Sequence, residues 1–545
     1  MRKQAILPIL FLLLFALSFV QAQPFTRQDS IRGSITPERA WWNLTYYHLQ
    51  IKVDITNKSF KGQNAIYYTV LEAGERMQVD LQPPLKITKV MQGKKELAFT
   101  QDGNAYYVSF NTPQKVGDKN SIVVFYEGIP QVSIRPPWSG GVTWNKDDNG
   151  NDFIATSCQG DGASLWWPCK DHMYDEPDSM LISITVPKHL INVSNGRLRS
   201  VVKHKDKTRT FNWFVSNPIN NYGVNINIGD YVHFSETYQG ENGVLDCDYY
   251  VLKYNLEKAK VQFKDATRTL EAFEYWFGPY PFYEDGYKLV EAPYLGMEHQ
   301  SSITYGNGYA NGYLGRDLSQ TGWGLKWDFI IVHESGHEWF ANNITYKDIA
   351  DMWIHESFTA YSENLFLDYH FGKQASAEYV IGTRQNIQND KPIIGPYDVN
   401  KSGSSDMYYK GANMLHTLRQ LVEDDTLWRE ILRGLNKEFY HQTVTTMQIE
   451  NYISRQAGKD LSAFFNQYLR DTRIPVLEYV IKESRLQYRW SQVVQNFDMP
   501  VIIYINGKKE WIFPTAQWSG KEIKEGITEV KVDVNFYVAV FNLEG

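Results

Sequence analysis

Two histidines and a glutamate between residues 333 and 337 form the pattern in this chain with the clearest chemical use. The letters His333-Glu334-x-x-His337 place the two imidazoles four positions apart. If this stretch is helical, both rings lie on one face, one turn apart, and can reach the same metal ion. Glu334 then lies about 100° round the helix from His333. It is poorly placed as a third ligand but well placed to hold a water beside the ion.

Glu356, nineteen positions after His337, is the best candidate for the third ligand. The stretch 349–369 repeats apolar residues at helical spacing, which predicts a second helix that carries this carboxylate. Two histidines and one carboxylate leave a coordination position open, as in catalytic zinc sites, whereas structural zinc is closed by four protein ligands. The pattern predicts one zinc ion per chain, held by His333, His337 and Glu356. A chance HExxH on a solvated helix is the alternative.

The residues that flank these ligands match a known family. The segments HESGHEWFANNIT and MWIHESFTAY resemble HELAHQWFGNLVT and LWLNEGFASY of the gluzincin aminopeptidases, the family of aminopeptidase N and leukotriene hydrolase. The resemblance implies a zinc aminopeptidase in which Glu334 is the general base that takes a proton from water and passes it to the leaving nitrogen.

A tyrosine after the metal ligands has a role implied by the same resemblance. Tyr408-Tyr409-Lys410-Gly411 is similar to the family's Y-x-K-G motif, whose first tyrosine matches Tyr408. This tyrosine is expected to stabilise the negative oxygen of the tetrahedral intermediate. Tyr409 is the neighbour with which it is most easily confused.

Residues 295–299, Leu-Gly-Met-Glu-His, are similar to the family's G-A-M-E-N motif. The resemblance implies that Glu298 binds the free amino group of a substrate, with Gly296 and Met297 alongside it. Leu295 and His299 depart from the motif. They leave open the path of the backbone beside the substrate and the hydrogen bond that asparagine normally makes.

The family resemblance also covers Gln159 and His355, and for each of them a second interpretation stays open. Counting back from Pro168-Cys169, Gln159 matches the second amine-binding residue, and its amide can accept a hydrogen bond from an ammonium group. The other interpretation is a turn glutamine in a glycine-rich loop. His355 stands where the family has asparagine, and it either orients Glu356 or is a satisfied core histidine.

Composition and charge exclude some functions. The 545 residues are 43% hydrophobic and 15% aromatic, which is typical of a globular chain of several domains. Two of the 55 basic residues and none of the 62 acidic ones lie within 1–22, so the remainder carries a formal charge of −9. A mildly acidic chain without a basic run is a poor nucleic-acid binder. Cys158, Cys169 and Cys247 have no metal-ligand spacing, and one disulfide or three free thiols are both open.

Residues 1–22 have the features of a secretory signal. Arg2 and Lys3 precede an apolar run from Ala5 to Val20, and Val20-Gln21-Ala22 is a small-residue cleavage site. The protein is therefore expected to be secreted or periplasmic. An uncleaved anchor is the competing interpretation. No later stretch approaches eighteen apolar residues, so no membrane span is expected once the signal is removed.

The hydrophobic pattern changes period twice along the chain, which predicts a multidomain α+β protein. Strand alternation dominates 23–254, helical spacing dominates 255–473, and strands return in 474–545. The family resemblance implies an N-terminal all-β saddle domain, a thermolysin-like α/β catalytic domain and a small C-terminal β-sandwich for these three ranges. It also implies a form without the family's C-terminal helical domain, and hence a more open cleft.

The sequence thus predicts a zinc metallo-aminopeptidase that acts on peptides with a free N-terminus. One alternative is a bifunctional hydrolase like leukotriene hydrolase, for which Gln159 is the only hint. Another is a non-catalytic peptide-binding scaffold. The preferred side chain at the first substrate position, the physiological substrate and the oligomeric state stay open.

Overall fold

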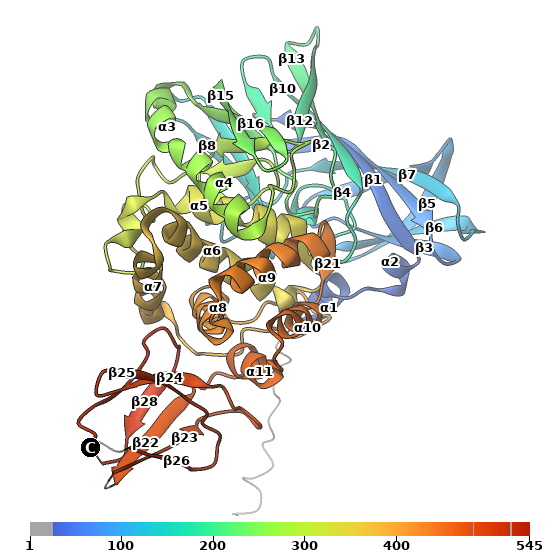
Figure 1. Ribbon diagram of the computed structural model, residues 1–545. Helices are drawn as coiled ribbons and strands as arrows, with labels where there is room; N and C mark the ends of the chain where they lie inside the picture. The colour runs from blue at the N-terminus through green and yellow to red at the C-terminus, as the bar shows by residue number, and fades with distance from the viewer. Residues whose placement is uncertain (1–24, 483, 524–525, 545) are drawn as a thin grey trace, which may run out of the picture.

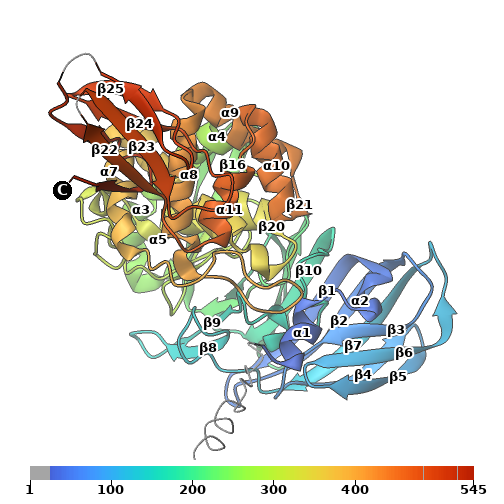
Figure 2. The same ribbon diagram turned by 90° about the horizontal axis from the view of Figure 1, so that it is seen from below.

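The computed structural model describes residues 25–482, 484–523 and 526–544, so the expected signal at 1–22 lies outside the described residues. The described chain forms a β-rich N-terminal region, a mixed α/β catalytic region and a C-terminal β region. Both views place the catalytic region between the two β regions (Figure 1, Figure 2). The predicted α+β architecture of three parts is confirmed. Among the described residues, no helix is both long and apolar enough to cross a bilayer.

The N-terminal region is built on a large sheet that, within the described residues, has ten strands in the order β12-β13-β10-β1-β2-β7-β4-β5-β6-β3. On β1, Leu49, Ile51 and Val53 are buried while the residues between them face outward, as the alternation predicts. The strands are β1 (Trp42–Asp54), β2 (Ser59–Val70), β3 (Gly74–Asp80), β4 (Lys86–Gln92), β5 (Lys95–Asp102), β6 (Ala105–Gln114), β7 (Lys119–Gly128), β10 (Ser179–Pro187), β12 (Arg197–Lys203) and β13 (Thr208–Val215).

A smaller sheet has the order β11-β14-β9-β8, and its buried residues share a hydrophobic core with the large sheet. It consists of β8 (Gly141–Lys146), β9 (Asp152–Ser157), β11 (Ile191–Val193) and β14 (Asn227–Gly229). The sequence pattern predicts a strand over 223–228, but only its last residues are in β14. Buried side chains bind the backbone before it instead, because Asn225 N donates to Asn195 Oδ1 at 2.9 Å. Such side-chain bonds replace a strand ladder.

The catalytic region has its own sheet in the order β15-β16-β17-β19-β18. Its strands are β15 (Tyr231–Gly240), β16 (Gly243–Leu252), β17 (Tyr287–Glu291), β18 (Gly296–Met297) and β19 (Ile303–Tyr305). The first two precede residue 255, where the sequence analysis starts the catalytic domain, so the change of sheet lies near Asp230 instead. Alternation identifies a strand but not its partner, and β16 pairs in parallel with β17 beyond the intervening helices.

Helices pack below and around this sheet and carry most of the site. They are α3 (Leu256–Gln262), α4 (Lys264–Phe277), α5 (Phe329–Gly336), α6 (Trp353–Phe371), α7 (Lys373–Gly382), α8 (Tyr409–Val422), α9 (Asp425–Glu438), α10 (Thr446–Ala457) and α11 (Ser462–Arg470). The helical spacing that begins at residue 255 gives α3 and α4, which are separated by a break at Phe263, and α4 ends before Gly278. The short strands β20 (Ile344–Tyr346) and β21 (Gln442–Val444) pair in parallel beside α6.

The C-terminal region forms, in its described part, two small sheets, β26-β23-β22-β28 and β25-β24-β27. The strands are β22 (Val476–Lys482), β23 (Arg485–Ser491), β24 (Val501–Ile505), β25 (Lys508–Ile512), β26 (Ser519–Glu522), β27 (Val530–Val532) and β28 (Ala539–Asn542). Its buried residues join the hydrophobic core of the catalytic region. Tyr468 Oη on α11 donates to the carbonyl of Tyr537 at 2.8 Å, which ties the two regions together.

Candidate active site

Helix α5 brings the two histidines together. It begins after Asp328, whose side chain accepts the free N–H groups of Ile330 and Ile331, and all its residues are buried. It ends at Gly336, and His337 follows with a helical backbone. The centroids of the His333 and His337 rings are therefore 5.0 Å apart. The structure thus places both imidazoles on one face, as the spacing predicts.

Glu356 on α6 faces the ε nitrogens of both histidines. Its Oε2 lies 3.9 Å from His333 Nε2 and 3.5 Å from His337 Nε2. This oxygen is buried and, among the described residues, has no hydrogen-bond partner. A buried carboxylate oxygen without a partner is strongly destabilised unless a cation binds it. Two nitrogens and one oxygen within 4.8 Å of one another fit a zinc ion with an open position.

The other ring nitrogen of each histidine is held by a neighbour. His333 Nδ1 donates to Glu363 Oε1 at 2.8 Å, and His337 Nδ1 donates to the Phe340 carbonyl at 3.0 Å. With their protons on Nδ1, both imidazoles present the lone pair of Nε2 towards Glu356. Burial lowers the pKa of His333 to about 4, which keeps it in the neutral form that a metal ligand requires.

Glu363 is a residue of the site that the sequence analysis missed. It lies two helical turns after Glu356 on the same face of α6, and its second oxygen accepts the hydroxyl of Tyr379 at 2.7 Å. Burial raises its pKa to about 8. The spacing of seven residues from Glu356 was the one signal that could have singled it out.

Glu334 belongs to a second group of close side chains, formed by Glu298, Glu334 and His337. Burial, followed by the charges of Glu298 and Glu356, raises its pKa well above the usual range of a carboxyl. The backbone of Gly296 runs close by, since a Cβ there would lie 2.8 Å from Glu334 Oε1. A buried carboxyl with a raised pKa beside a metal site is suited to accept and return a proton.

Gln159, from the loop after β9, reaches across from the N-terminal region. Its Nε2 donates to Glu298 Oε1 at 2.6 Å and to Glu356 Oε1 at 3.0 Å. Both amide protons are then used, and the carbonyl oxygen of Gln159 is left to accept a bond. The Glu298 backbone is fixed as well, because Asn342 Nδ2 donates to its carbonyl at 2.9 Å. The structure thus joins the two predicted amine-binding residues to each other and to Glu356, one of the candidate metal ligands.

Comparison with known proteins decides the family. The Peptidase M1 N-terminal domain matches residues 43–222, and the Peptidase family M1 domain matches residues 261–468, which include all the residues of the metal group. The chain belongs to peptidase family M1.

Relatives and solved structures agree with this assignment. Leucyl aminopeptidase of Saccharolobus solfataricus is 23% identical over 90% of this chain and 62% of its own length. Leukotriene A-4 hydrolase of Xenopus laevis is 22% identical over 77% of this chain and 68% of its own length. The crystal structure of an M1 zinc metallopeptidase mutant from Deinococcus radiodurans, bound to a Tyr-Ser-Ala substrate, has the same fold. Its TM-score is 0.68 at 20% identity, over 80% of this chain and 96% of that one. The chain spans about three-fifths of the length of the first archaeal aminopeptidases that it matches.

In this M1 chain Tyr408, and not Tyr409, faces the metal group. The half-buried Tyr408 ring lies over that of His333, with centroids 6.1 Å apart. Burial raises the pKa of Tyr408, and the nearest charges that raise it further are Glu356, Glu298 and Glu334. For Tyr409 the corresponding neighbour after burial is Glu363. Of the two tyrosines, Tyr408 is therefore the one beside the candidate metal ligands.

The two histidines that depart from the family motifs are both fully buried, and neither belongs to a candidate metal group of the described residues. His355 Nε2 accepts the backbone N–H of Tyr346 at 2.9 Å, and its Nδ1 lies 3.4 Å from the hydroxyl of Tyr222, which donates to Glu298 Oε1 at 3.1 Å. His299 Nδ1 lies 2.8 Å from Thr304 Oγ1. Each ring thus has a partner in the core. The three cysteines are buried free thiols.

Proposed function

We propose that this protein is a zinc-dependent aminopeptidase that hydrolyses the N-terminal peptide bond of peptides. The observation that carries the proposal is one buried cluster that joins three metal-ligand side chains to Glu334, to Tyr408 and to the Glu298–Gln159 pair. The parts of this cluster match the needs of the reaction: a nucleophile, a base, a donor for the oxyanion and an anchor for the amine.

His333, His337 and Glu356 would hold the zinc, one ion per chain. Zinc held by such a ligand set lowers the pKa of water to about 7 and polarises a carbonyl group. Glu334 accepts the proton of the attacking water and delivers it to the departing nitrogen. Its raised pKa suits this exchange, since the carboxyl must hold the proton between the two steps.

The remaining groups fix the substrate. Tyr408 donates its hydroxyl proton to the developing oxyanion. Glu298 binds the substrate ammonium as a charged acceptor, and the carbonyl oxygen of Gln159 accepts a second hydrogen bond from it. With the amine fixed beside the metal ligands, only the first peptide bond reaches the reacting centre.

The names of the relatives support an aminopeptidase over the alternatives. The archaeal relatives are called aminopeptidases, and the Deinococcus radiodurans structure holds a peptide. The leukotriene-hydrolase-like alternative depends on Gln159 alone and is less well supported. An intact ligand set and base argue against a non-catalytic scaffold. Secretion or export to the periplasm stays a proposal from residues 1–22.

The variant Glu334→Gln tests the proposal. We expect it to keep its zinc and lose turnover of an aminoacyl anilide by at least about 100-fold, because the amide retains the shape of the carboxylate but cannot accept the proton. Zinc content and kcat are measured on the same preparation. Glu271→Gln, an exposed glutamate on α4, is the matched control and should leave both unchanged. Substantial residual turnover in Glu334→Gln, or equal cleavage of an N-acetylated substrate by the wild type, would contradict the assignment.

A further inference from the structure

A segment that precedes the family domains lies against the active-site loop that carries Gln159. Residues 26–40, here called the strap, contain the short helices α1 (Arg27–Gly33) and α2 (Pro37–Ala40). The match to the M1 N-terminal domain begins only at residue 43. The strap is therefore a feature of this chain whose role the family match does not describe.

Arg32 connects the strap to the residue next to Gln159. Its Nη2 donates to the carbonyl of Gly160 at 2.9 Å, and its Nε lies 3.3 Å from Asp171 Oδ2. The Arg32 side chain is 15% exposed and that of Asp171 4%. A partly buried guanidinium that binds both a carbonyl and a carboxylate has a well-defined position.

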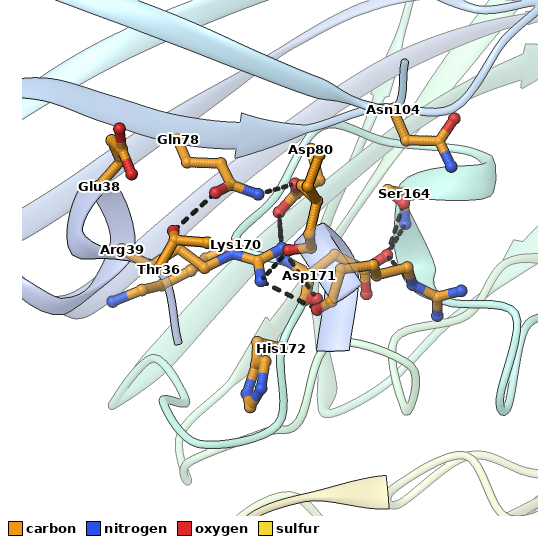
Figure 3. A network of polar contacts seen from close by, with 12 residues as sticks. Thr36, Glu38, Arg39, Gln78, Asp80, Asn104, Ser164, Lys170, Asp171 and His172 are labelled. Atoms are coloured by element: carbon orange, nitrogen blue, oxygen red, sulfur yellow. Dashed lines mark hydrogen bonds and ion pairs between the residues drawn. The ribbon is translucent and has the colours of Figure 1, made fainter. Parts of the chain in front are cut away.

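The loop is shaped around this contact. Gly162 has a φ of +93°, and a Cβ there would lie 2.1 Å from Arg32 Nη2 and 2.2 Å from Asp171 Oδ2. Only glycine leaves room for the ion pair at this position. Asp171 is in turn fixed by Ser164, whose hydroxyl donates to Oδ2 at 2.5 Å (Figure 3).

The same carbonyl also binds the catalytic region. Asn400 Nδ2 donates to Gly160 O at 3.0 Å, and Asn400 N donates to the carbonyl of Asp29 in the strap at 2.9 Å. A Cβ on Gly33 would lie 2.1 Å from the carbonyl carbon of Val399, so the backbones touch. The strap thus contacts both the Gln159 loop and residues 399–400, which also contact each other.

Behind the loop the protein is not fully packed. A cavity of about 40 Å³ is lined by residues of the strap, the loop and the catalytic region, among them Arg32, Gly160, Tyr222, Tyr346 and Asn400. This volume has room for at least one water. Apolar packing therefore does not hold the loop from this side, where Arg32 and Asn400 bind the Gly160 carbonyl.

The strap itself is anchored in the N-terminal region by a buried arginine. Arg39 Nη2 binds Asp80 Oδ2 at 2.6 Å (Figure 3). Arg39 Nη1 donates to the carbonyls of Arg32 at 2.9 Å and Ser34 at 2.8 Å. Arg39 is fully buried. The carbonyl of Arg32 is thus held by the same ion pair that fixes the edge of the large sheet.

We propose that Arg32 is a positioning residue for Gln159, and that the strap keeps the amine site in register with the metal ligands. This inference rests on the proposed function, because it assigns Arg32 an effect on binding of the substrate amine. Arg32 acts through the Gly160 carbonyl and touches neither substrate nor metal. A shift of Gly160 moves the Gln159 amide away from both Glu298 and Glu356, to which it donates.

A pair of zinc-binding inhibitors tests this role. We compare the hydroxamate of an amino acid with the hydroxamate of the same acid without its amino group. The inhibition constant of the amine-free compound divided by that of the amino acid compound measures amine recognition alone. In Arg32→Gln this ratio should fall by about tenfold, since small misplacements of a positioning group have effects of this size. The affinity for the amine-free inhibitor and the zinc content should not change. Arg27→Gln, on the same helix but paired with the exposed Asp102, is the matched control and should keep the ratio.

A double-mutant cycle separates positioning from general damage. If Arg32 acts through Gln159, Arg32→Gln should lower the ratio in the wild type and have no further effect in Gln159→Ala. Asn400→Ala removes the other bond to Gly160 O and should lower the ratio in the same direction. An unchanged ratio in Arg32→Gln, or an equal loss in both backgrounds, would overturn the inference. A wild type that binds both hydroxamates equally would instead contradict the proposed function.

Discussion

Two buried polar clusters of this protein neutralise their charge in different ways. In the N-terminal cluster, cations of the protein lie beside buried carboxylates: Arg39 binds Asp80 at 2.6 Å (Figure 3), and Lys170 binds Asp175 at 2.5 Å. The active-site cluster collects four buried glutamates, Glu298, Glu334, Glu356 and Glu363. Among the ion pairs of the described residues, none joins these four to a lysine or arginine, and two of them pair only with His333 and His337.

The pKa values follow this difference. Burial lowers the pKa of Lys170 only to about 8, because Asp175 opposes the shift, so the amine is largely charged at neutral pH. Burial raises the pKa of Glu356 to about 7 and that of Glu363 to about 8. An excess of buried negative charge and a carboxylate oxygen without a partner are costly unless a cation is supplied from outside. The comparison teaches that the first cluster is neutralised by side chains of the folded chain, whereas the second lacks such cations, which is the arrangement that the proposed zinc site requires.

The largest effect on stability is expected in the N-terminal cluster. Arg39→Met removes the cation and leaves Asp80 buried and unpaired, so the free energy of unfolding should fall by about 3–5 kcal/mol. Chemical denaturation measures this change. Arg76→Met, whose exposed side chain pairs with Glu38 at 3.5 Å, is the control, with an expected change below about 1 kcal/mol. Equal changes in the two variants would mean that the buried cluster is not held by its own charges.

A smaller effect is expected in the active site, where the change should weaken zinc binding but stabilise the metal-free protein. Glu363→Gln should weaken zinc binding by about tenfold, because the amide oxygen still accepts from His333 Nδ1 but without charge. In the metal-free protein the same change removes a buried carboxyl and should raise the melting temperature. Competition with a chelator and thermal unfolding without metal measure the two quantities. Glu378→Gln, exposed on α7, should change neither. A metal-free Glu363→Gln that is less stable than the wild type would break the contrast between the clusters.

The sequence predicted the parts of the site that depend on local periodicity and on the family motifs. His333 and His337 converge because a helix sets their spacing, and the second helix carries Glu356 to them. Tyr408, Glu298 and Gln159 were found through the family motifs, not through the chemistry of their residue types alone. The structure places all of them beside the metal group.

What the sequence could not predict depends on contacts between distant segments. Apart from its spacing of seven residues from Glu356, Glu363 cannot be told from a surface glutamate in the sequence, and only the fold buries it beside Tyr379. The contact between Arg32 and Gly160 spans 128 positions, and no periodicity relates the two residues. The membership of β15 and β16 in the catalytic sheet depends in the same way on a partner strand that follows two helices. Such pairings arise from tertiary packing, which overrides local preference.

The position of zinc in the protein tests the central claim most directly. Anomalous diffraction from crystals grown with zinc, recorded on both sides of its absorption edge, locates the ion without any assumption about the ligands. The account predicts one peak bonded to His333 Nε2, His337 Nε2 and a Glu356 oxygen at about 2.0–2.2 Å. A peak elsewhere, or a Glu356 carboxylate beyond bonding reach of an ion held by the two histidines, would contradict it.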